Sequence, residues 1–65
     1  MTTTLYADRA RHKERAARQA LIEAQTMARA AMRDYRSAGE PAKAETLARL
    51  YDDLEAAYRQ LTHHP

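Results

Sequence analysis

The feature that most constrains this 65-residue chain is the scarcity of residues that break a helix. It contains one glycine and two prolines, whereas alanine, arginine, leucine and glutamate make up more than half of it. Glycine and proline strongly disfavour a helix interior, and the four abundant residue types sit comfortably in one. The sequence therefore predicts an all-α protein built from long helices.

One short stretch, SAGEP at positions 37 to 41, interrupts the helical pattern. Gly39 suits the left-handed position that follows a helix end, and Pro41 suits the first turn of a new helix. We therefore expect a helix from about residue 4 to 37, a turn at 37–41 and a second helix from about 41 to 62. Two helices joined by so short a turn lie antiparallel. The prediction is a single helical-hairpin domain spanning residues 1–65.

The chain is too short to bury a large core by itself. Domains of this size usually rely on disulfides, a metal or a partner chain for stability. There is no cysteine, which excludes disulfides and thiolate metal sites and fits a reducing, cytoplasmic location. We therefore expect a second chain to complete the core.

The apolar positions form one stripe on each predicted helix when residues are placed about 100° apart. In the second helix several follow the alternating three-and-four spacing of a coiled-coil seam. The predicted seam consists of Ala17, Leu21, Ala24, Ala28, Ala31, Tyr35, Leu47, Leu50, Tyr51, Leu54, Tyr58 and Leu61.

A single hairpin would leave much of the leucine and tyrosine stripe exposed to water. Long exposed apolar stripes usually mark contact sites. We therefore expect two copies to pair into a four-helix bundle, because twofold dimers are the commonest assemblies. The alternative is a hairpin that docks on a different, larger partner.

Positive charge is concentrated in the first half of the chain. Residues 1–37 hold eight Arg and Lys against four Asp and Glu, and the remaining residues hold three against five. Six arginines of the first helix fall in one angular sector, away from the alanines. They are Arg11, Arg15, Arg18, Arg29, Arg33 and Arg36.

Ile22 lies in the same sector as the arginines, where an apolar side chain is out of place unless it has a partner. An apolar anchor ringed by arginine is typical of a protein-binding hot spot, although single exposed apolar residues are also common on any surface. Arginine pairs well with carboxylates, which favours an acidic protein partner. The alternatives are a nucleic acid held through its phosphates and a purely structural coiled-coil module.

No catalytic constellation, cofactor motif or metal site is evident. Asp8 and His12 stand four residues apart but lack a third ligand nearby. No apolar run is long enough to span a bilayer, and the first residues have no secretory signal pattern. We expect a non-enzymatic protein without a cofactor that acts in the cytoplasm.

The overall layout is similar to several kinds of short helical hairpin. The seam spacing resembles that of ROP-type RNA-binding dimers. The turn at 36–40 and the later LEAA segment at 54–57 resemble small co-chaperones of type III secretion. Small phage-encoded inhibitors of host regulators also take this form. These resemblances imply a module that inhibits, sequesters or chaperones another protein, or an RNA-binding regulator.

Overall fold

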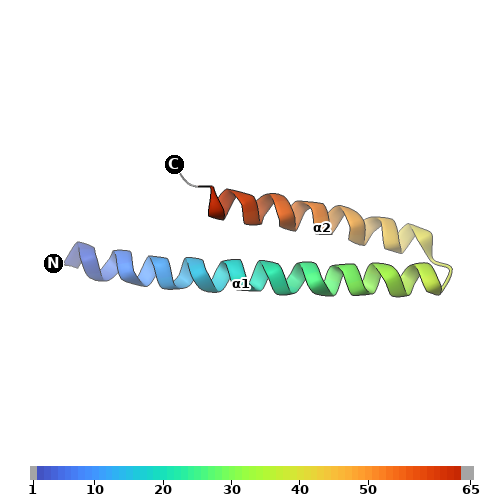
Figure 1. The fold of residues 1–65 in the computed structure, drawn as a ribbon, viewed down its shortest axis with the longest axis horizontal. Coiled ribbons are helices and arrows are strands. Elements are labelled where there is room, and N and C mark those ends of the chain that lie inside the picture. Colours follow the sequence, from blue (N-terminus) through green and yellow to red (C-terminus); the bar gives the residue numbers. More distant parts are fainter. Residues whose placement is uncertain (1, 64–65) are drawn as a thin grey trace.

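The computed structural model describes the backbone of residues 2–63 and the side chains of residues 4–63. Two helices, α1 (Thr2–Ser37) and α2 (Pro41–Thr62), account for nearly all of this part, which contains no strand. They pack against each other as an antiparallel hairpin (Figure 1). The predicted all-α hairpin is therefore confirmed. Helix α1 begins two residues earlier than expected.

The turn between the helices is closed by backbone hydrogen bonds around Gly39. The N–H of Glu40 donates to the carbonyl of Tyr35 (2.8 Å), and the N–H of Gly39 donates to the carbonyl of Arg36 (3.2 Å). This pair of bonds is the Schellman arrangement that ends many helices. It requires a left-handed residue, and Gly39 has a φ of 76°. Pro41 then starts α2 at a position where its missing N–H is not needed.

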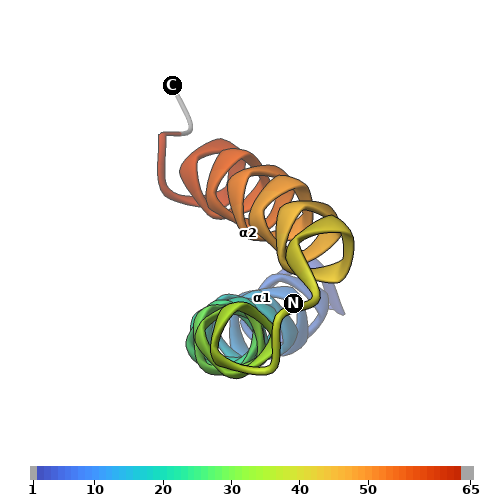
Figure 2. The ribbon, with the colours of Figure 1, turned by 90° about the vertical axis from the view of Figure 1, so that its right-hand side faces the viewer.

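The two helices differ in length, with 36 residues in α1 and 22 in α2. The N-terminal turns of α1 therefore extend beyond the end of α2 (Figure 1). Viewed end on, the hairpin is a single layer of two helices with nothing covering either broad side (Figure 2). The molecule measures 57 × 19 × 11 Å.

The core of the hairpin is thin. Among the described residues only Ala28 and Ala44 are buried apolar side chains, at 5% and 2% exposure. Most of the predicted seam is half-buried along the contact between the helices. Those half-buried seam residues are Leu21, Ala24, Ala31, Tyr35, Leu47, Tyr51, Leu54, Tyr58 and Leu61.

Two residues of the predicted seam, Ala17 and Leu50, are exposed in the hairpin and contribute nothing to its core. Instead, α1 presents polar and flexible side chains to α2 at several levels. Glu14, Arg18, Gln25 and Met32 are half-buried, and together with Leu21, Ala28 and Tyr35 they follow an alternating three-and-four spacing. The face of α1 that meets α2 is thus rotated from the predicted alanine line toward the arginines.

Gly39 provides a test of the turn. An added Cβ would meet no atom within 4 Å, so substitution costs only the strain of the left-handed backbone. Gly39→Ala is expected to lower the free energy of unfolding by about 1–2 kcal/mol, and Gly39→Asn by less, because Asn tolerates this conformation better. Chemical denaturation followed by circular dichroism measures both. Equal losses for Ala and Asn would contradict the assigned geometry.

Leu54 provides a test of the seam. Because it is half-buried against α1, Leu54→Ala is expected to cost about 2 kcal/mol, the low end of the range for leucine truncation. The matched control is Leu5→Ala, at a leucine that is 50% exposed, with an expected change within about 0.5 kcal/mol. Similar losses in the two variants would show that Leu54 does not pack in the seam.

Candidate functional site

A row of exposed side chains runs along α1 beside its contact with α2. Four of these side chains recur every seventh residue, so they keep the same angle to the contact between the two helices. Arg33 lies one turn beyond Arg29, on the same side. We call this surface the arginine edge; it consists of Arg15, Ile22, Arg29, Arg33 and Arg36, all of them exposed.

Arg29 connects the arginine edge to α2. Its guanidinium lies over the ring of Tyr51, 5.4 Å from the ring centroid. This geometry is a cation–π contact, which holds the cation in place while leaving its N–H groups open to another acceptor. Arg29 is thus positioned by a residue of the opposite helix.

A shallow hollow of about 280 Å³ lies next to this contact, and Ile22, Gln25, Thr26, Arg29 and Tyr51 line it. Ile22 is 41% exposed. The hydroxyl of Thr26 donates to the carbonyl of Ile22 at 3.1 Å, so its hydrogen-bonding capacity is partly used within the helix. The hollow therefore combines one aliphatic side chain, Ile22, with polar groups and an arginine.

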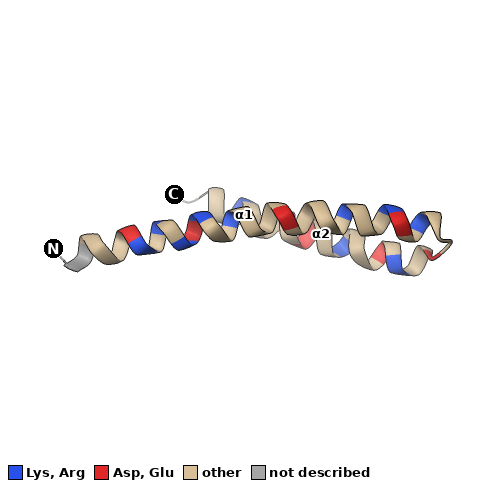
Figure 3. Cartoon of the chain, turned by 90° about the horizontal axis from the view of Figure 1, so that it is seen from below, with Lys and Arg blue, Asp and Glu red and all other residues tan. Residues whose placement is uncertain are grey.

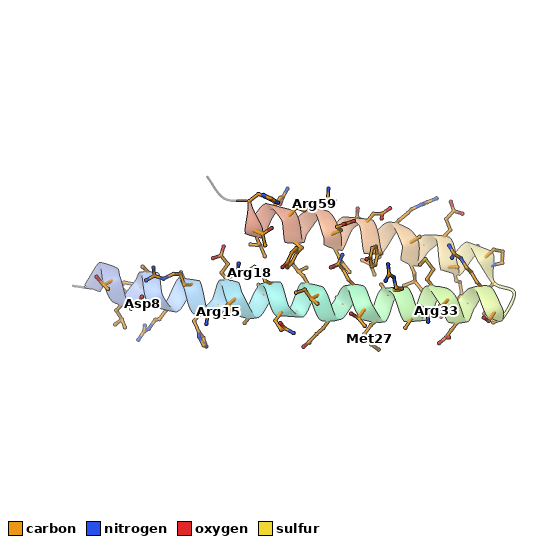
Figure 4. The ribbon with its side chains drawn as sticks, viewed as in Figure 1. Asp8, Arg15, Arg18, Met27, Arg33 and Arg59 are labelled. Atoms are coloured by element: carbon orange, nitrogen blue, oxygen red, sulfur yellow. The ribbon has the colours of Figure 1, made fainter. Side chains whose placement is uncertain are left out.

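Two of the predicted partner-binding arginines are separate from the arginine edge. Arg11 pairs with Asp8, three residues away on the same helix. Arg18 is half-buried on the side of α1 that faces α2, whereas Arg15 points away from α2 (Figure 4). The rotation of the α1 seam explains this difference, because it brings the expected outward sector partly into the contact.

The remaining cations of the edge lack carboxylate partners. Lys and Arg are interspersed with Asp and Glu along the hairpin (Figure 3). Other basic residues use this proximity: Arg49 lies 3.2 Å from Glu45, and Arg59 lies 3.2 Å from Glu55. Among residues 4–63, no ion pair includes Arg15, Arg33 or Arg36. Their charges are available to an external acceptor.

Part of this site could not be read from the sequence. The pattern placed Ile22 among the arginines, but it gave no reason to connect Gln25 or Thr26 with Tyr51. Those contacts depend on which residues of α2 lie level with Ile22 across the hairpin. The seven-residue spacing of Arg15, Ile22, Arg29 and Arg36 was the available signal, and it marks one side of a seam.

In the part of the chain that the structure describes, no three His, Asp or Glu side chains gather as ligands for a metal ion. None of the described helices combines the length and apolar character needed to cross a membrane. The chain matches no protein-family model, no curated protein and no solved structure.

Proposed function

We propose that this chain works without catalysis, by binding an acidic protein through the arginine edge. The observation that supports the proposal is the exposed Ile22 set among arginines that have no carboxylate partner within the described chain. An apolar anchor surrounded by charged groups is the usual composition of a binding hot spot and its rim. Binding of this kind would inhibit, sequester or chaperone the partner.

Arginine sets the chemistry of the partner. Its planar guanidinium forms two parallel hydrogen bonds with a carboxylate, and it is hydrated less strongly than lysine. Arg29 is already oriented by Tyr51, so less side-chain freedom is lost when it binds. A partner that offers Asp or Glu around an aliphatic or aromatic side chain complements both the hollow and its rim.

A protein is favoured over a nucleic acid by what surrounds the arginines. The second helix carries Glu45, Asp52, Asp53 and Glu55, against three basic residues in the same helix. These carboxylates repel a phosphate backbone that approaches from the side of α2. The apolar Ile22 also offers nothing to a phosphate chain, whereas it suits an apolar pocket on a protein.

We further propose that the hairpin acts in the cytoplasm as a homodimeric four-helix bundle. Two buried alanines among residues 4–63 are a small core, and chains of this size usually gain stability from association. The exposed Leu50 and Met27, at 46% and 69%, are apolar side chains that a second hairpin would cover.

Ile22→Asp tests the protein-binding proposal. The tagged chain serves as bait in a lysate of its native cell after nuclease treatment, and captured proteins are identified by mass spectrometry. We expect the wild-type chain to retain an acidic protein that Ile22→Asp loses. For the purified partner, the affinity loss should reach about thirtyfold or more, because truncated anchors commonly cost 2 kcal/mol or more.

The matched control is Leu5→Asp, which introduces the same charge at another exposed apolar residue of α1. It should bind like the wild type, and Arg33→Glu should bind less tightly, mostly at low salt. Both variants and Ile22→Asp should keep the wild-type helix content. Capture of the same acidic protein by Ile22→Asp and by the wild type would rule out the arginine edge as its site.

Binding to duplex DNA and to RNA tests the alternative. Because phosphate contacts release counterions, the logarithm of the binding constant should fall by about 0.9 per contacted phosphate on duplex DNA for each tenfold rise in salt. We expect only weak, sequence-independent binding at physiological salt, measured by fluorescence anisotropy. Tight and sequence-selective binding under those conditions would favour a nucleic-acid regulator instead.

A further inference from the structure

A second side of α1 is apolar, and it lies across the seam from the arginine edge. The alanines in this row recur every seventh residue, so they keep a constant angle to the contact with α2. The outermost two are exposed, and the two nearest the turn are half-buried at the margin of the seam. The row consists of Ala10, Ala17, Ala24 and Ala31.

Another row lies beside the alanines, about 60° further around the helix from α2. It also repeats every seven residues, and with the first row it gives an alternating three-and-four spacing from residue 10 to 34. That is the pattern of a coiled-coil seam, but α2 does not occupy it. The second row consists of Lys13, Ala20, Met27 and Asp34, all exposed.

We call the apolar middle of these two rows the alanine face; it consists of Ala17, Ala20, Ala24, Met27 and Ala31. Met27 is 69% exposed and points away from α2 (Figure 4). Leu50 of α2 is 46% exposed and borders this face. It lies about 100° around α2 from Tyr51, on the side of Tyr51 away from Arg29. Most of the alanine face is therefore a helix surface that α2 leaves uncovered, with Ala24 and Ala31 at its margin.

The exposed area is large enough to require a partner of substantial size. The chain exposes 5440 Å² of surface, whereas a compact protein of 7.4 kDa exposes roughly 4,200 Å². The excess, roughly 1,200 Å², exceeds the ~800 Å² that each partner buries in a standard protein interface. Burial of about 800 Å² of the alanine face and its border by one more hairpin would remove about two thirds of this excess.

The charges on the second row indicate which molecule fits. Lys13 and Asp34 lie at equal distances from the middle of the row, with Ala20 and Met27 between them. They are about 32 Å apart along one helix, so they cannot pair within a chain. When a second α1 lies antiparallel with its centre near Ala24, each Lys13 comes within a helical turn of the other copy's Asp34. Met27 then packs on alanine.

We propose that a second copy of this chain binds the alanine face, with the two α1 helices antiparallel about a twofold axis near Ala24. This rests on the proposed self-association and names the surface and orientation that it uses. Alanine allows two helix backbones to approach closely, and Met27 adapts its shape to the gaps that remain. The two arginine edges remain outside the contact, so the dimer offers two binding sites.

Ala20→Glu tests the interface. Ala20 is exposed in the hairpin and glutamate is a good helix former, so the substitution does not disturb the packing of α1 on α2. The matched control is Gln19→Glu, which places the same side chain at an exposed residue of α1 about 100° around the helix from Ala20 and outside both rows. Light scattering should give the mass of two chains for the wild type and for the control. Ala20→Glu should give one chain, with its dissociation constant raised at least tenfold.

Two outcomes would overturn different parts of the proposal. A wild-type chain that stays monomeric at high micromolar concentration contradicts self-association itself. A dimeric Ala20→Glu variant shows that self-association uses another face.

If Ala20→Glu also loses helix content, two charge-reversal variants test the interface instead. Lys13→Asp and Asp34→Lys should each weaken the homodimer, because each places like charges at both ends of the interface. Mixed together they should form heterodimers, because both ends then carry opposite charges. Native mass spectrometry of the mixture measures this preference. A statistical mixture of the three dimers would rule out the antiparallel arrangement.

Discussion

The hydrogen bonds that reverse the chain around Gly39 determine how every other residue is used. They end α1 at Ser37 and allow α2 to start at Pro41, and so short a turn directs α2 back along α1. The partner of α1 is therefore fixed locally, before any side-chain packing is considered. Because α2 is shorter and covers only one side, most of the circumference of α1 remains outside the hairpin.

The circumference of α1 divides into surfaces of different chemistry, and a seven-residue spacing keeps each of them continuous. The side that meets α2 carries Leu21, Ala28 and Tyr35 together with polar side chains. The arginine edge follows on one flank and the alanine face on the other. A change of one position in the heptad moves a residue to a different side of the helix. One helix can therefore pack against α2, carry charge for a partner and present an apolar strip.

The sequence predicted the fold because the signals for it are local. Helix propensity, the single interruption by Gly39 and Pro41, and the short turn are sufficient to define two antiparallel helices. In the second helix the predicted seam residues other than Leu50 are half-buried, since large apolar side chains contrast strongly with their neighbours; they are Leu47, Tyr51, Leu54, Tyr58 and Leu61.

The rotational position of α1 was not predictable in the same way. Alanine differs little from its surroundings in hydrophobicity, so the predicted seam included the alanine row next to Leu21, Ala28 and Tyr35, which do face α2. The positions that do face α2 include Arg18 and Gln25, whose long side chains bury their aliphatic parts and keep their polar ends in water. Periodicity cannot reveal such residues. The contact between Arg29 and Tyr51 depends on the same rotation, which is why the hollow beside it emerged only from the structure.

Of the two buried alanines, only Ala44 lies close to the turn, because Ala28 stands about two and a half turns before the end of α1. Ala44 stands one turn into α2, whereas the far end of α2 diverges from α1 (Figure 1). With Ala44 taken as a pivot, the rest of α2 forms a lever of about 26 Å up to Leu61. A rotation of about 5° at the pivot moves Leu61 by roughly 2 Å. A small change of angle beside Gly39 would thereby become a larger change in the width of the hairpin at its open end.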